Sequence, residues 1–241
     1  MTTLFLFFIT AAAPTVVISP IYGPDLSFSV QSHATDVQTV QGSMVELRPH
    51  SIIVDDTYRQ RFVRMDGKYR LIHTIGTEIE HHTENGITQL LHRPIHDIIR
   101  FDPAGIFDTG PSDPIDLIPL YPGHAVALGD TWKPTTAVKT NYGTGTASYK
   151  FHVECITHNP NGHTIARISV SFTSTLQPLP AFAGGLAEAT GDGWFLWDCT
   201  INQRSETHLH GVYTLRMPTA VARRLITDDD TLVAHRKVET F

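Results

Sequence analysis

Apolar and polar side chains alternate with a period of two over much of this chain. Between Tyr149 and Cys155 every second residue is apolar and the residues between them are polar. Successive side chains of a β-strand point to opposite faces, so this spacing predicts a strand with one apolar and one polar face. The alternation resumes at 167–172, after the turn-forming residues 159–162 (Asn-Pro-Asn-Gly). We therefore expect an antiparallel hairpin in which Cys155 shares the apolar face.

Two more hairpins are predicted by the dipeptides Asp66-Gly67 and Asn85-Gly86, which suit tight two-residue turns. The strands that they are expected to join are 57–65 with 69–75, and 77–84 with 87–92. Further strands are predicted at 26–31, 44–54, 193–199 and 205–217.

Helical periodicity is weak by comparison. It favours short helices at Phe182–Ala189 and Ala220–Ile226, and one helical turn at His92–Arg100. Many antiparallel strands with few helices predict an all-β fold. We expect a strongly curved half-barrel or open barrel with one or two short helices, built as a single β-rich domain over residues 14–241.

Residues 1–13 contain an apolar run followed by small residues, as in the apolar part of an export signal. No Lys or Arg precedes the run, and it is shorter than the roughly 20 residues that cross a bilayer as a helix. An export signal and an N-terminal strand of the domain are both consistent with this pattern. We expect membrane contact, if any, only through the N-terminus.

Composition and charge narrow the classes of function. Hydrophobic residues make up 41% of the 241 residues and charged residues 17%, a balance that supports a core and argues against disorder. The formal net charge is −6, so no basic field is available to bind nucleic acid. Cys155 and Cys199 form no CxxC motif, which excludes a zinc ribbon or thioredoxin-type site. A disulfide between them and two buried thiols both remain open.

Two sequence phrases carry a resemblance to a known family. The first, 120–132, ends in Gly129-Asp-Thr-Trp132, and the second, 193–198, is Gly-Trp-Phe-Leu-Trp-Asp followed later by Ser205. Over roughly residues 115–217 the chain resembles a family of uncharacterised bacterial envelope proteins, thought to share the half-barrel fold of the periplasmic lipoprotein carrier. The resemblance implies a periplasmic or extracellular location, with the cytoplasm as the alternative, and carries over no catalytic residue or cofactor.

The residues themselves predict structural roles for Asp130 and Asp198, because aspartate in such turns bonds to nearby backbone. The acidic run 228–230 lacks the glycine and closing glutamate of a calcium loop, so we interpret it as a solvated turn.

Fourteen histidines raise the question of metal or acid–base chemistry. His208 and His210 would share one face of a strand with Glu206, and two imidazoles with a carboxylate are zinc or copper ligands if they converge. The alternative is a polar face exposed to solvent, which we favour.

A second cluster contains Glu78, Glu80, His81 and His82, and in extended structure Glu78, Glu80 and His82 share one face. Metal or general-base chemistry is conceivable there, but solvated charge is the preferred interpretation. His92 and His96 would meet on a helix, which Pro94 between them disfavours.

The apolar face of the curved sheet is the remaining candidate surface. It forms either a packed core or a cleft for an apolar ligand. We therefore predict a non-enzymatic envelope protein that binds a lipid-like ligand or a protein partner there, without a cofactor. The alternatives are a pocket enzyme, either cyclase-like or a metal hydrolase using His208 and His210, and a structural interaction module. The predicted ligand-binding residues are Tyr149, Phe151, Val153, Ile168, Val170, Phe172, Leu209, Tyr213 and Leu215.

Overall fold

The computed structural model describes nine segments of the chain: 15–18, 26–42, 46–66, 69–84, 86–101, 121–139, 143–178, 186–217 and 220–236. Their strands are β1 (Thr15–Val17), β2 (Leu26–Gly42), β3 (Glu46–Asp66), β4 (Tyr69–Glu84), β5 (Ile87–Phe101), β6 (Ala125–Ala127), β7 (Thr131–Trp132), β8 (Thr135–Lys139), β9 (Gly143–His158), β10 (Thr164–Pro178), β11 (Leu186–Asp198), β12 (Gln203–Met217) and β13 (Ala220–Arg236).

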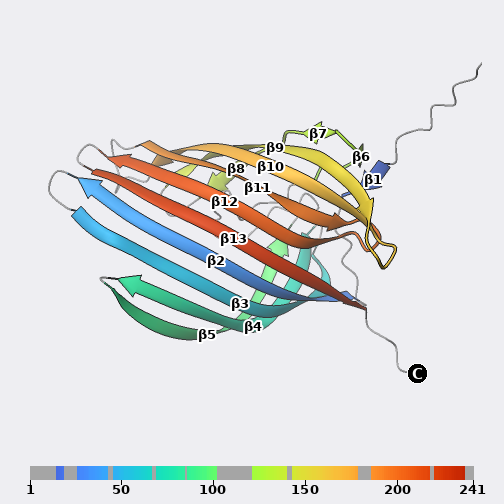
Figure 1. Cartoon of the computed structure of the whole chain (residues 1–241), viewed down its shortest axis with the longest axis horizontal. Coiled ribbons are helices and arrows are strands. Elements are labelled where there is room, and N and C mark those ends of the chain that lie inside the picture. The colour runs from blue at the N-terminus through green and yellow to red at the C-terminus, as the bar shows by residue number, and fades with distance from the viewer. Residues whose placement is uncertain are drawn as a thin grey trace, which may run out of the picture.

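The long strands form one curved antiparallel sheet (Figure 1). Its order is β5-β4-β3-β2-β13-β12-β11-β10-β9-β7, and β8 also pairs with β9. β1 and β6 form a separate two-stranded sheet. The sheet does not close into a barrel, so β5 is left at one edge. The predicted all-β, mainly antiparallel and open fold is confirmed.

The three predicted hairpins are present. β9 pairs with β10, with Phe151 opposite Val170, and the turn between them has Gly162 at a φ of 80°. The Asn159 side chain accepts hydrogen bonds from the backbone N–H groups of Asn161 and His163, at 3.0 and 2.9 Å. β3 pairs with β4 and β4 with β5, as the two turn dipeptides predict.

One detail of the first hairpin was predicted wrongly. The register of β9 and β10 shifts at Arg167 and Ile168, so Val153 lies opposite Ile168 and Cys155 opposite Arg167. This bulge inserts one extra residue and reverses the facing of the strand beyond it. Cys155 therefore pairs with a residue of the polar face, not the apolar face.

The predicted helices are also wrong wherever the structure describes them. Ala220–Ile226 lies in β13, His92–Arg100 in β5, and 186–189 in β11, while 182–185 lie outside the described residues. β13 is paired along its whole length with β12 and β2, so sheet pairing outweighs a weak local helical tendency. The run 228–230, expected as a turn, also lies inside β13.

The described part of the chain contains no helix, so it offers none that is long and apolar enough to cross a membrane. Residues 1–13 lie outside the described residues, as does most of the connection between β5 and β6.

Aromatic rings organise the core, which lies against β9–β12. Gly129, with a φ of 87°, and Asp130 form the turn before β7, and the Asp130 carboxylate accepts the N–H of Ala127 at 2.8 Å. This turn places Trp132 flat on Phe151, with ring centroids 4.8 Å apart. The structural role predicted for Asp130 is confirmed, although its bond runs back along the chain.

Candidate functional site

The nine residues predicted to bind a ligand lie together on one face of β9, β10 and β12. We call this the inner face and the opposite side the outer face. All nine belong to the hydrophobic core and are only 0–7% exposed. Tyr149 and Phe172 rings lie 5.8 Å apart, and Phe151 meets Phe195 of β11 edge to face at 6.3 Å. The side chains pack on one another as a core does.

Glycines of β11 make room for this packing. An ideal Cβ on Gly191 would lie 2.2 Å from Cε1 of Phe172 and 2.4 Å from the backbone oxygen of His210. One on Gly193 would lie 2.1 Å from the backbone oxygen of His208. The phrase at 193–198 therefore begins at a position where a side chain has no space.

Strand pairing defines the inner face over the whole sheet, and the type of side chain on that face differs between its two halves. The face is apolar over β9–β12 but holds ionisable side chains in β2–β5, where Val54 lies opposite Glu80 and Ile52 opposite His82. One continuous row of paired residues runs Phe151, Val170, Gly193, Leu209, Asp228, Ala34, Val54, Glu80.

The ionisable zone is built around Glu80. Its carboxylate lies 2.6 Å from His82 Nε2 and 3.1 Å from Arg93 Nη1, while Arg93 also lies 3.8 Å from Glu78. Glu80 is only 9% exposed. Burial by itself would raise the pKa of Glu80, but the hydrogen bond from His82 and the charge of Arg93 outweigh it and hold the pKa below its ordinary value. The predicted sharing of one face by Glu78, Glu80 and His82 is confirmed, but Glu80 is buried and paired, contrary to the interpretation as solvated charge.

The outer face reverses this distribution. Over β9–β12 it is polar, and Glu206, His208 and His210 lie on it along β12. His208 hydrogen-bonds Asp229 of β13 and stacks on Trp194 of β11. Within the described segments, no three His, Cys, Asp or Glu side chains are grouped to hold a metal ion.

A line of polar and aromatic side chains crosses eight strands on this outer face. Neighbours along it are joined by ion pairs, ring contacts or hydrogen bonds, except for Asp229 and His33, which are register partners. The members are Glu154, Arg167, Trp194, His208, Asp229, His33, Asp55 and His81. Sequence periodicity could not reveal this line, because it depends on the register of strands far apart in the chain.

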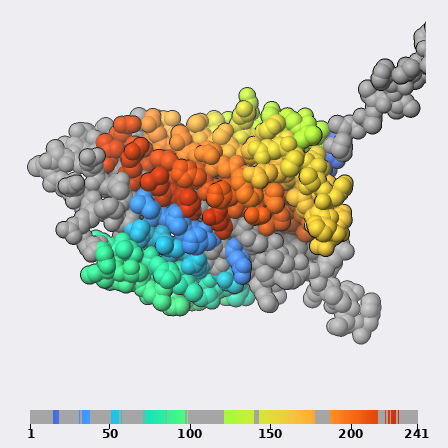
Figure 2. Space-filling view, in the orientation of Figure 1, coloured from blue at the N-terminus to red at the C-terminus, as the bar shows by residue number. Residues whose placement is uncertain are grey.

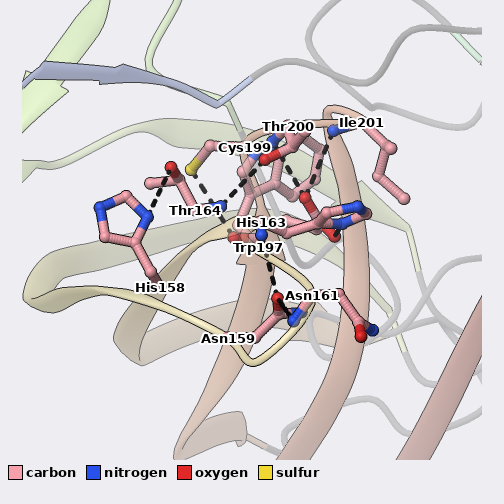
Figure 3. Close-up of polar contacts among 10 residues, drawn as sticks. His158, Asn159, Asn161, His163, Thr164, Trp197, Cys199, Thr200 and Ile201 are labelled. Atoms are coloured by element: carbon pink, nitrogen blue, oxygen red, sulfur yellow. Dashed lines mark hydrogen bonds and ion pairs between the residues drawn. The ribbon is translucent and has the colours of Figure 1, made fainter.

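A third group of polar residues lies at the end of the sheet (Figure 3). One Asp198 oxygen accepts the N–H groups of Thr200 and Ile201 at 2.9 and 3.3 Å, and the other lies 2.6 Å from His163 Nδ1. Asp198 therefore closes the turn after β11, which confirms its predicted structural role. The histidine partner was not predicted.

Cys199 follows in this turn, and its Sγ lies 3.7 Å from the backbone oxygen of Trp197. Burial, with a smaller contribution from the Asp198 carboxylate, raises the pKa of the Cys199 thiol to about 11. Cys155 and Cys199 are both free, half-buried thiols. Cys199 therefore stays protonated at neutral pH and is a poor nucleophile.

His92 and His96 do not meet on a helix. Both lie on the outer face of β5, where His96 instead contacts His73 of β4, with Nε2 atoms 3.4 Å apart. These two rings meet edge to face, at an interplanar angle of 78°.

These features define the class of protein: an open, curved antiparallel sheet with a packed aromatic half and an ionisable half. No known protein family matches the chain, and no curated protein matches it. Among solved structures, an outer membrane channel from Pseudomonas putida F1 is 5% identical, with 90% of this chain and 98% of that chain covered and a TM-score of 0.29. An engineered protein studied for asymmetric conductivity is 8% identical, with 85% and 99% covered and a TM-score of 0.23. TM-scores this low carry no argument about this chain.

Proposed function

We propose that this chain is a non-enzymatic binding protein that takes an amphipathic, lipid-like ligand on the inner face of β2–β5. The observation that carries the proposal is the border between apolar and ionisable side chains on that face. Ile52 and Val54 are half-buried and lie directly opposite His82 and Glu80. A ligand with an apolar chain and a polar head matches such a border, because the chain can contact the apolar side chains while the head contacts the ionisable ones.

The position of the site follows from exposure. The nine core residues of β9–β12 have no free surface to offer, whereas Ile52, Val54 and Leu91 of the same inner face are half-buried or exposed. We therefore assign the nine residues a structural role, as a packed core that lies beside the ligand site. Arg93 and Glu80 lie next to Leu91 and supply the polar end of the site.

Mass spectrometry of organic extracts of natively purified protein tests occupancy directly. We also expect dansyl-labelled undecanoic acid to bind with enhanced fluorescence.

Val54→Arg places a charge in the apolar part of the site and should weaken binding of this probe by at least about tenfold, equivalent to about 1.4 kcal/mol. The matched control is Val212→Arg, on the outer face of β12, which should bind as wild type does. An empty wild-type protein that also ignores the probe would refute the proposal.

The envelope assignment belongs to the same proposal. It is supported by the two phrases that resemble the envelope family, since both build the same core: Trp132 stacks on Phe151, and Trp197 is fully buried with its Nε1 donating to the Val17 carbonyl at 3.2 Å. Detection of the intact protein in a periplasmic extract of its native cells, rather than with cytoplasmic markers, would test it.

A further inference from the structure

The outer face of the β4–β5 hairpin has an unusual arrangement of side chains. In its middle, four outward Ile or Leu residues each lie directly opposite a histidine on the neighbouring strand. Ile75, Leu90 and Ile98 are 50%, 52% and 59% exposed, too much for core residues. We call this checkerboard the hairpin face, and it consists of the pairs His73–Ile98, Ile75–His96, Ile79–His92 and His81–Leu90.

Acidic residues are segregated to the other side of the hairpin. Glu78, Glu80 and Glu84 all lie on the inner face. The hairpin face itself holds none of them. In the space-filling view the hairpin, in green, lies along the lower border of the molecule (Figure 2).

The neighbouring strand β3 brings the Asp55 carboxylate near His81. Asp55 lies 3.8 Å from His81 and 2.7 Å from His33. Arg59 is paired with Ile75 and Arg61 with His73. On the free side, β5 has no neighbour among the described strands.

We propose that the hairpin face docks onto the surface of an anionic lipid bilayer, and that acidification strengthens the docking. Exposed aliphatic side chains enter the boundary between head groups and acyl chains, while histidine ordinarily gains its proton between pH 5 and 8 and then attracts anionic lipid. The free edge of β5 leaves backbone N–H and C=O groups unpaired among the described strands, and these cannot enter hydrocarbon. The hairpin therefore lies at the interface and does not insert further.

The size of the pH effect follows from the number of new charges. The Nε2 atoms of His73 and His96 lie 3.4 Å apart, and two positive charges that close repel each other, so we count one charge for this pair and one for His92. His81 lies 3.8 Å from the Asp55 carboxylate and is left out of the count. Each positive charge at an anionic surface strengthens binding about fivefold, so two charges should strengthen it about 25-fold.

Co-sedimentation with vesicles tests the proposal, using phosphatidylcholine alone and phosphatidylcholine with added phosphatidylglycerol. We expect binding to the anionic vesicles to rise about 25-fold from about pH 7.5 to about pH 5, and binding to neutral vesicles to stay weak. The double variant Leu90→Glu/Ile98→Glu should lose binding at both pH values. Thr173→Glu/Thr175→Glu, on the exposed outer face of β10, is the matched control and should lose far less.

A second variant separates the electrostatic part from the apolar part. His73→Gln/His92→Gln/His96→Gln should keep the weak binding at about pH 7.5 and lose most of the increase at about pH 5. Equal binding of wild-type protein to neutral and anionic vesicles at about pH 5 would overturn the proposal. So would dimerisation without lipid that Leu90→Glu/Ile98→Glu abolishes, since the face would then belong to a second copy of the chain.

Discussion

Gly191 gives the sharpest test of how the inner face is packed. It lies in β11 opposite Phe172 of β10 and Gly211 of β12. In Gly191→Ala the new methyl group would lie 2.2 and 2.5 Å from ring carbons of Phe172 and 2.4 Å from the backbone oxygen of His210. The ring can rotate away, but the carbonyl belongs to a paired strand and can move only with that strand.

The cost follows from this overlap. Forcing an extra methyl group into a well-packed core typically destabilises a protein by about 1–3 kcal/mol. For a chain of this size, each kcal/mol lowers the melting temperature by roughly 2–4 °C, so Gly191→Ala should melt about 2–12 °C lower than wild type. Thermal unfolding followed by circular dichroism measures the shift, and urea unfolding checks that the slope of the transition is unchanged.

Two comparisons show whether the overlap is the cause. In a Phe172→Leu background the ring contacts disappear but the carbonyl remains, so Gly191→Ala should still destabilise, by less than in wild type. Gly162→Ala is the control without overlap: no atom lies within 4 Å, and its φ of 80° causes backbone strain of about 1–2 kcal/mol. Asparagine at 162 should recover part of that loss, because it tolerates this conformation. A Gly191→Ala protein melting within about 1 °C of wild type would refute this packing.

Three further predictions concern buried polar groups. Pairing with His82 and Arg93 lowers the pKa of Glu80, so its contribution to stability is present above the ordinary glutamate pKa of about 4.3 and is lost as the pH falls below it. The stability difference between wild type and Glu80→Gln, measured by urea unfolding, should therefore shrink in acid, and a difference that grows there would contradict the prediction. Cys199, with its pKa near 11, should react with iodoacetamide at neutral pH far more slowly than a free cysteine peptide, until urea exposes it, as peptide mass spectrometry would show. Thr207 is only 2% exposed, and its buried hydroxyl bonds to no residue that the structure describes. Thr207→Val should therefore raise the melting temperature by about 2–4 °C, and a lower melting temperature would mean that the hydroxyl has a partner.

Local sequence signals predicted the strands and turns because those signals act over a few residues. Alternation correctly placed Phe151 and Val170 on the same face of a hairpin, and the Asn85-Gly86 dipeptide marked the β4–β5 turn correctly. The bulge near Cys155 escaped prediction, since a single extra residue leaves the composition of the strand unchanged. The helix expected at Ala220–Ile226 failed for a related reason: its pairing partners lie in β12 and in β2, the latter almost two hundred residues earlier.

The change from apolar to ionisable side chains on the inner face could not be predicted from any single strand, because apolar and polar residues alternate in each strand in the usual way. Ile52 and Val54 in β3, or Glu78 and Glu80 in β4, do not by themselves say which set faces the same side as Phe151. Only register does so, through Leu209, Ala34 and Val54 to Glu80.

The two unusual surfaces of this protein share one origin. A strand that turns its acidic residues inward must turn its apolar residues outward, since side chains alternate. Because Glu78 and Glu80 point to the inner face of β4, Ile75 points to the outer face, where it is exposed. Shifting β4 by one residue would exchange the faces of the glutamates and of Ile75. Such a slip would bury aliphatic side chains and free the carboxylates into water, yet the structure holds the other register, with Glu80 between His82 and Arg93. The Glu80 ion pairs belong to this register, so the ionisable zone of the inner face and the exposed hairpin face both depend on the same strand pairing.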